Sequence, residues 1–387
     1  MTGPVPPDEA QRAAAHALWT FPAILGSAFV VGWAAEAAQF HIAQGLALAL
    51  LAWIQVLPEF AVEAAISWER NIPLMTANFT GALRLLTGLG WPVIWVMHAA
   101  SQRRSRHASR ERWPAIELDE EHSIEIIGLL PPLLYFGWIV FKGTLSCWDA
   151  AVLLALYAGY LAVLQRVPPK GHEEIEDVAA VPRAVLGLAP TPRTLAIAGL
   201  FLVGALGVYL TTGPFLRSMI ALATVLGISQ FVFIQWVAPL LSEFPEFTTT
   251  SYWSSQGKAP MALMNMVSSN INQWTVLAAM IPIVYSISLG RPAAVPIAEH
   301  RVELVLTLLQ GLLGTLMLAN LTFHAYEALG LFALWFAQLL VPSWREEVSV
   351  LYALWLAIEL AIAARRGGLR AFPAFARQWS RRSRRQR

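Results

Sequence analysis

Long apolar segments separated by short polar loops make up most of this chain. A helix needs about 20 apolar residues to cross a bilayer, and the hydrophobic pattern predicts eleven such segments. Their ranges are 20–38, 43–68, 73–98, 124–142, 147–166, 194–213, 219–256 (long and broken), 259–288, 302–320, 323–341 and 347–364. The pattern therefore predicts an all-α membrane protein with about 11 transmembrane helices.

Two prolines, a glutamate and an asparagine recur in one register. They are Pro58, Glu59, Pro73 and Asn78, which return 187 positions later as Pro245, Glu246, Pro260 and Asn265. Internal repeats with prolines inside apolar segments are typical of secondary transporters. Each copy holds five predicted spans, and because five is odd the second copy must enter the membrane from the opposite side. We therefore expect two inverted five-helix repeats followed by one added C-terminal helix.

Basic residues predict how the chain is oriented. Arginine-rich stretches follow the third, fifth and eleventh spans, and eleven spans place all of them on one side, which the positive-inside rule identifies as the cytoplasm. The N-terminus is then outside and the C-terminus cytoplasmic. The expected parts are a first repeat at 20–166, a cytoplasmic linker at 167–193, a second repeat at 194–341, an extra helix at 347–364 and a basic cytoplasmic tail at 365–387.

Composition narrows the class of protein further. The chain is 57% hydrophobic and 13% charged, about half the charged fraction of a soluble domain. Cys147 is the only cysteine, which excludes an internal disulfide or a thiolate metal site. No phosphate loop or catalytic motif appears, so we expect neither an enzyme nor a cofactor. The arginine-rich tail fits anionic lipid better than nucleic acid, the alanine- and arginine-rich composition indicates a bacterial inner membrane, and the oligomeric state stays open.

The two repeated glutamates carry the candidate chemistry. Glu59 and Glu246 each follow a proline directly, near the middle of an apolar segment. Proline removes a backbone donor and frees a carbonyl one turn earlier, and carbonyl and carboxylate oxygens are the ligands of hard cations. A charged side chain at the bilayer centre costs at least about 2.5–3.5 kcal/mol, so it is rarely without a function. These features predict cation binding at both glutamates.

Paired Pro-Glu helices, each followed by a helix that opens near an asparagine, resemble the two α-repeats of the cation/calcium antiporter superfamily. Sodium/calcium and calcium/proton exchangers are its best-known members. The resemblance covers residues 20–341 and is specific in spans two, three, seven and eight. It implies that Glu59 and Glu246 are the central ion ligands. It assigns further ligand positions to Asn78, Ser242, Asn265, Ser269 and Asn270, and Glu243, which replaces a serine of the family, is a candidate ligand beside them.

The first repeat departs from the family pattern. Val56, Ala82 and Leu83 stand where the family has two serines and an Asn or Asp. Half of the side-chain ligands of that repeat are therefore missing, and the resemblance leaves the number of bound ions open.

Two charged residues near these positions are hypothesised to modulate the site. Arg84 lies near the centre of span three, and we expect it either to pair with Glu59, Glu63 or Glu243 as a fixed cation or to reach an interface. Glu63 lies one helical turn after Glu59 on the same face, and its candidate roles are a proton relay or an acid on the access path. Its counterpart in the second copy is Thr250, so the repeat gives no support for a function at Glu63.

Three further acids are assigned a structural role. Glu125, Asp149 and Glu303 lie in predicted first turns, where a carboxylate caps the helix or is favoured by its dipole.

The function that this sequence favours is secondary antiport of Ca²⁺, or another divalent cation, against Na⁺ or H⁺ by alternating access. The expected partners are inorganic cations and membrane lipid. A proton-coupled or monovalent cation exchanger is one alternative, because the first repeat lacks ligands and carries Arg84. A non-transporting relative that binds partners through its loops and tail is another.

Overall fold

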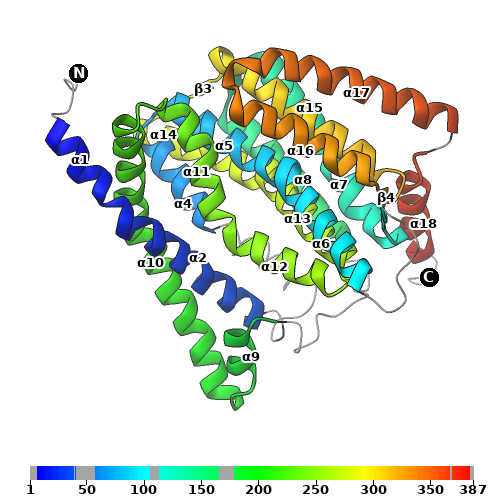
Figure 1. Ribbon diagram of the computed structural model, residues 1–387, viewed down its shortest axis with the longest axis horizontal. Helices are drawn as coiled ribbons and strands as arrows, with labels where there is room; N and C mark the ends of the chain where they lie inside the picture. The colour runs from blue at the N-terminus through cyan, green and yellow to red at the C-terminus, as the bar shows by residue number, and fades with distance from the viewer. Residues whose placement is uncertain are drawn as a thin grey trace. The chain divides into compact units, whose positions relative to one another are not determined.

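The fold is described from a computed structural model, which covers residues 7–38, 40, 57–104, 113–164, 178–366 and 368–383. Several sequence predictions fall outside these residues. They concern residues 43–56 of span two with Val56, most of the basic loop after span three at 105–112, the acidic part of the linker at 173–177, and the last residues of the basic tail. The described part of the chain is predominantly helical (Figure 1).

The chain divides into two compact units, each assembled from separate stretches of sequence. Unit 1 comprises Met1–Ala82, Pro168–Glu246 and Val284–Arg291, and unit 2 comprises Leu83–Val167, Phe247–Ile283 and Pro292–Arg387. Helices α5 (Ile72–Leu85), α12 (Phe244–Ser255) and α14 (Ala278–Leu289) each begin in one unit and end in the other.

Unit 1 is organised around the long helix α10 (Pro190–Val225). Its other elements are α1 (Pro7–Ala15), α2 (Ala17–Ala38), α4 (Leu57–Trp68), α9 (Ala180–Leu186) and α11 (Gln230–Ser242). Helix α10 packs along α2, as Figure 1 shows in green and dark blue. Gly204 and Gly207 allow the close approach, since a Cβ added at Gly204 would lie 2.7 Å from the Val31 side chain. Small residues are the usual means by which helices approach each other in membranes.

Unit 2 contains the remaining helices and the strands of the described part of the chain. They are η1 (Leu86–Gly90), α6 (Trp91–Arg104), β1 (Ile116–Glu117), η2 (Glu120–His122), α7 (Ser123–Lys142), β2 (Thr144–Leu145), α8 (Cys147–Leu164), α13 (Ala259–Asn272), η3 (Gln273–Leu277), β3 (Val295–Pro296), η4 (Ala298–His300), α15 (Arg301–Leu318), β4 (Thr322–Phe323), α16 (Ala325–Leu340), η5 (Pro342–Trp344), α17 (Arg345–Arg366) and α18 (Ala371–Ser383). Large aromatic side chains fill its core, for example Phe136 against Trp274, whose ring centroids lie 4.8 Å apart.

The elements recur with the spacing of the sequence repeat. Helices α12 and α13 begin 187 positions after α4 and α5, and the two π-helical turns η1 and η3 differ by the same number. Helices α15 and α16 begin 178 positions after α7 and α8. Two small antiparallel sheets pair strands of opposite copies, β1 with β4 and β2 with β3. Exchanging the two copies converts one pairing into the other, as a two-fold relation requires. The orientation of the copies in a membrane stays a prediction.

The helix boundaries around span six differ from those predicted. Helix α10 continues to Val225, whereas we expected one span to end at residue 213 and the next to begin at 219. Pro214 lies inside α10 and does not end it, because transmembrane helices tolerate proline. The helix ends where Gly227 adopts a φ of +67°, a conformation that favours glycine. The predicted break in span seven is confirmed, since α11 ends at Ser242 and α12 begins at Phe244.

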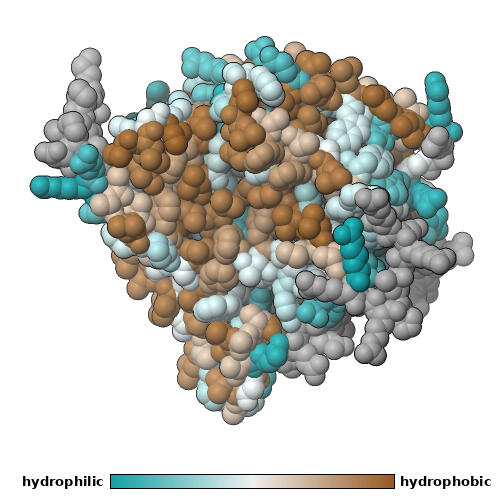
Figure 2. All heavy atoms as spheres, in the orientation of Figure 1, coloured by the Kyte–Doolittle hydropathy of each residue, from teal (hydrophilic) through white to brown (hydrophobic). Residues whose placement is uncertain are grey.

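Much of the described surface is suited to lipid. Eight helices are long and apolar enough to cross a membrane, and α11 and α16 are shorter apolar helices. Figure 2 shows apolar side chains over much of one face, and α10 exposes Leu195, Leu202, Leu206 and Leu210. The predicted count of eleven spans is not tested by these helices alone.

Candidate cation site

The first candidate ligand lies at the start of a helix. Helix α4 is described from Leu57 onward, and Pro58 lies in the first described turn. Glu59 therefore also lies in the first turn. Its side chain is 1% exposed, and that of Glu63, one turn later, is 0% exposed. Two acids are thus buried on one face of α4.

An asparagine links the two acids. The side-chain nitrogen of Asn78, on α5, donates to Glu59 Oε1 and to Glu63 Oε2, each at 2.8 Å. One oxygen of each carboxylate therefore lies within hydrogen-bond distance of the same amide nitrogen. Asn78 is a predicted ligand and Glu63 a predicted modulator, and the structure brings both to Glu59.

The end of α11 completes the surroundings of Glu59. Ser242 Oγ donates to Glu59 Oε2 at 2.5 Å, so each oxygen of that carboxylate accepts a hydrogen bond. Glu243 follows directly as the C-cap of α11, and Glu246 lies in the first turn of α12. Both of these acids are buried. The break between α11 and α12 thus places a hydroxyl and two carboxylates within five residues.

The remaining predicted ligands lie on α13, in unit 2. Ser269 and Asn270 are buried, and Asn265 is half-buried. The Asn270 side-chain nitrogen donates to Met266 O at 3.1 Å, which leaves its oxygen as the group suited to a cation. Their role as ligands stays a prediction, because the acids described above belong to unit 1.

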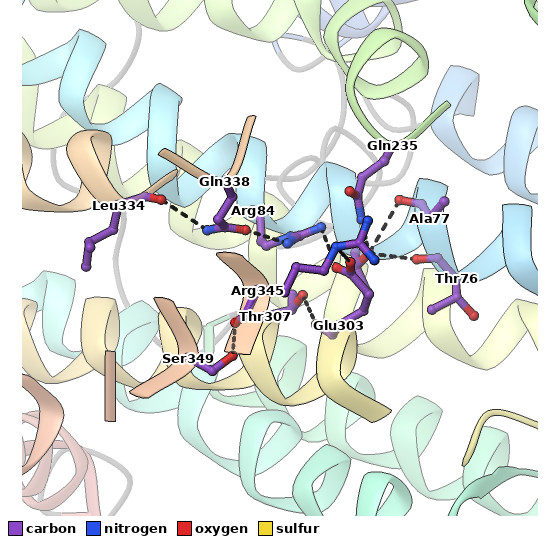
Figure 3. Close-up of polar contacts among 11 residues, drawn as sticks. Thr76, Ala77, Arg84, Gln235, Glu303, Thr307, Leu334, Gln338, Arg345 and Ser349 are labelled. Carbon is purple, nitrogen blue, oxygen red and sulfur yellow. Dashed lines mark hydrogen bonds and ion pairs between the residues drawn. The ribbon is translucent and has the colours of Figure 1, made fainter. Parts of the chain in front are cut away.

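Arg84 has a different partner from those expected. Its Nη2 lies 2.9 Å from Glu303 Oε2, and its Nη1 donates to Gln338 Oε1 at 2.6 Å (Figure 3). Its side chain is 1% exposed, so it does not reach an interface. Glu303 also forms an ion pair with Arg345 at the start of α17. The predicted pairing with Glu59, Glu63 or Glu243 is corrected to Glu303.

Helix geometry accounts for this correction. Arg84 follows Asn78 by six residues, and at about 100° per residue the two side chains point about 120° apart around α5. Asn78 faces the acids of α4, so Arg84 faces elsewhere. Glu303, to which we assigned a structural role at a helix start, instead neutralises a buried guanidinium. The available signal was the lone arginine of an apolar span, which must meet an acid from another span.

Glu125 lies in the first turn of α7 and Asp149 in the first turn of α8, as predicted. Asp149 Oδ2 accepts a hydrogen bond from the Ser146 N–H at 2.7 Å and from its hydroxyl at 2.6 Å, which confirms the predicted cap of α8. Lys142 also pairs with Asp149.

A cation at this site would need neutral oxygens as well as carboxylates. Within the described residues, no group of three or more His, Cys, Asp or Glu side chains is placed to hold a metal ion. The oxygens of Asn78, Ser242 and the backbone would therefore have to contribute, as is common for hard cations.

Comparison with known proteins gives the family. The family described as sodium/calcium exchanger protein matches residues 13–165 and 196–344. A crystal structure of the H⁺/Ca²⁺ exchanger CAX is 30% identical to this chain, covers 95% of this chain and 92% of that one, and superposes with a TM-score of 0.85. Structures of the sodium-calcium exchanger NCX_Mj, at 18% identity over 86% of this chain and 99% of that one, share the fold with a TM-score of 0.54. No curated protein matches the chain. The chain therefore belongs to the sodium/calcium exchanger protein family, whose members are membrane transporters and not enzymes.

Proposed function

We propose that this protein is a secondary antiporter that exchanges Ca²⁺, or another divalent cation, for H⁺ or Na⁺. The observation that carries the proposal is the buried pair of carboxylates, Glu59 and Glu63, joined by Asn78. Among the described residues, neither acid forms an ion pair with lysine or arginine, and Arg84 is occupied by Glu303. Buried carboxylates require a compensating charge, and a transported cation supplies it.

The comparisons support the exchange of cations. CAX is described as an H⁺/Ca²⁺ exchanger and NCX_Mj as a sodium-calcium exchanger, so calcium is common to both neighbours and the counter-ion differs. The proposed central ligands are Glu59 and Glu246. The proposed supporting ligands are Asn78, Ser242, Glu243, Asn265, Ser269 and Asn270.

Alternating access follows from competition for one site. Calcium and the counter-ion would both neutralise the same acids, so each would displace the other. An empty site would keep its uncompensated carboxylates at mid-membrane, which disfavours reorientation without an ion. We place the protein in a bacterial inner membrane, with eleven spans, the N-terminus outside and the C-terminus in the cytoplasm.

Uptake of ⁴⁵Ca²⁺ into proteoliposomes tests the function. We expect uptake when an H⁺ or an Na⁺ gradient is imposed, and loss of uptake in Glu59→Gln and in Glu246→Gln. Glu69→Gln is the matched control, because this glutamate is exposed at the end of the same helix α4.

Two outcomes would contradict the proposal. Folded protein that takes up no Ca²⁺ under either gradient would favour another cation or a non-transporting relative. Uptake that persists in Glu59→Gln would remove that residue from the site.

Uptake driven by the H⁺ gradient in the absence of Na⁺ would identify the counter-ion as H⁺.

A further inference from the structure

A polar stripe runs along α4 beyond Glu59. Glu59, Glu63 and Ser67 follow one another at intervals of four residues and therefore share one helix face. All three are at most 1% exposed. The stripe ends at Trp68, which is 57% exposed, and at the exposed residues 69–70.

The length of this stripe matches half a bilayer. Nine residues separate Glu59 from Trp68, and at about 1.5 Å per residue they span about 13 Å along the helix. The hydrocarbon core of a bilayer is about 30 Å thick, so half of it is about 15 Å. The stripe can thus connect a glutamate at mid-membrane with the interface, where tryptophan is enriched.

Three buried oxygens on this stripe and beside it have no hydrogen-bond partner within the described part of the chain. They are Glu63 Oε1, Ser67 Oγ and Asn78 Oδ1. The other polar atoms of Glu63 and Asn78 are occupied by the link between the two side chains. An unsatisfied buried oxygen is costly, and carboxylate, hydroxyl and amide oxygens are all ligands of hard cations.

The hydroxyls at the same positions of the second copy both donate hydrogen bonds. Thr250 corresponds to Glu63, and its hydroxyl donates to Phe247 O at 3.3 Å within its own helix. Ser254 corresponds to Ser67, and its hydroxyl donates to Ile94 O at 2.6 Å. The oxygens without a hydrogen-bond partner at these positions thus belong to the first copy alone. They are therefore not a general property of the repeat.

We propose that Glu63, Ser67 and the side-chain oxygen of Asn78 form a second station for a divalent cation, one helical turn from Glu59. The station lies on the side of the membrane reached by the loop at 69–71, which is the outside in the eleven-span arrangement. It receives the ion on its way between that side and the central site. The second copy provides no such station toward the other side. This inference rests on the proposed antiport function.

The kinetic consequence is an asymmetric dependence on Ca²⁺. Replacing Glu63 by the residue of the second copy, Glu63→Thr, should raise the KM for Ca²⁺ supplied from the side of the loop at 69–71 about tenfold, the loss expected for one charged ligand. The KM measured from the opposite side should change little. Thr250→Val is the matched control, and it should leave both KM values unchanged.

Sidedness can be read from the protein itself. The orientation in sealed proteoliposomes follows from labelling of Glu69→Cys by an impermeant thiol reagent in a Cys147→Ser background, since Cys147 is the only natural cysteine. Fluorescence-detected size exclusion establishes that each variant is folded. If Glu63→Thr does not fold, Ser67→Ala provides the same test and should shift the same KM in the same direction by a smaller factor.

Each outcome decides between the alternatives. An equal rise in KM on both sides would place Glu63 in the central site and overturn the second station, and unchanged KM values on both sides would also overturn it. Both results leave the antiport function intact, because the wild type still transports. A folded wild type that moves no Ca²⁺ overturns the antiport function and the station together.

Discussion

At the scale of single residues, Glu303 forms ion pairs with two arginines. Its carboxylate contacts Arg84 from α5 and Arg345 from the start of α17. Arg84 is almost entirely buried, whereas the Arg345 side chain is 29% exposed. The pair with Arg84 is therefore the one whose loss leaves a charge without water or a counter-ion. Gln310 and Gln338 add hydrogen bonds to the backbone and the side chain of the same arginine.

Removing this carboxylate should be strongly destabilising. Glu303→Gln leaves the Arg84 guanidinium buried without its counter-charge, and breaking a buried pair in this way costs about 3–5 kcal/mol. Thermal unfolding in detergent measures the loss. Glu299→Gln is the control, since Glu299 is exposed one turn earlier and its replacement should change stability by less than about 0.5 kcal/mol.

A double variant tests whether the destabilisation by Glu303→Gln comes from the buried charge that it leaves on Arg84. Arg84→Met combined with Glu303→Gln removes both charges and should be more stable than Glu303→Gln alone. Costs that simply add would mean that the two side chains are not coupled.

Ser242 should matter through its hydrogen bond to Glu59. Ser242→Ala removes the donor at 2.5 Å and leaves one oxygen of the carboxylate without it. A hydrogen bond to a charged group contributes about 1.5–3 kcal/mol, so we expect the KM for Ca²⁺ to change by about tenfold or more. Ser255→Ala is the control, because that hydroxyl is exposed and bonds only within its own helix. Equal kinetics in the two variants would show that Ser242 does not set the position of Glu59.

Sequence reasoning at the residue scale worked where symmetry constrained it. The repeated Pro-Glu dipeptides predicted both buried acids, Asn78 followed from the same register, and Ser242 followed from the family resemblance. Arg84 has no such support, because its counterpart in the second copy is Ile271. Its partner depends on the rotation of α5 and on the packing of three other helices, and neither can be obtained from spacing along one chain.

At the scale of elements, two glycines determine how closely α10 approaches α2. A Cβ at Gly204 would lie 2.7 Å from a methyl group of Val31 and 2.9 Å from its backbone nitrogen. The backbone atom cannot move without displacing α2. The packing therefore requires glycine at this position, although glycine is intrinsically a weak helix former.

Gly204→Ala should consequently loosen this helix pair. Overpacking of this kind costs about 1–3 kcal/mol, and the melting temperature in detergent should fall. Gly199→Ala lies on the same helix with no atom within 4 Å of the added Cβ, so it should be neutral or slightly stabilising through its better helix propensity. A similar fall in both variants would attribute the effect to the helix backbone instead of the contact with α2.

Hydropathy predicted the apolar helices better than their ends. The predicted end of span six at residue 213 was wrong, because α10 continues to Val225 and the chain turns at Gly227, whose φ is positive. The π-helical turns η1 and η3 have no proline or glycine signature in common. In the two copies η1 packs against α16 and η3 against α8, and a hydrophobic pattern does not contain such long-range contacts.

At the scale of the whole molecule, the two copies share their arrangement of helices and strands but differ in their polar residues. Helices and strands recur at offsets of 187 and 178 positions, and each small sheet pairs a strand of one copy with a strand of the other. The polar residues do not follow this symmetry, as Glu63 opposite Thr250 and Arg84 opposite Ile271 illustrate. A symmetric frame suits a transporter that must expose one site to two sides in turn. The unequal residues allow the two sides to differ in affinity.

Inversion of the two copies gives the sharpest test at this scale. Glu69 and Gln256 occupy equivalent exposed positions, 187 residues apart, at the ends of α4 and α12. Inverted copies must place them on opposite sides of the membrane, because five spans lie between them, whereas parallel copies would place them on the same side. In a Cys147→Ser background, an impermeant thiol reagent should therefore label Glu69→Cys in right-side-out vesicles and Gln256→Cys in inside-out vesicles. Labelling of both in one type of vesicle would exclude the inverted repeat, and with it the assignment of the second station to one side.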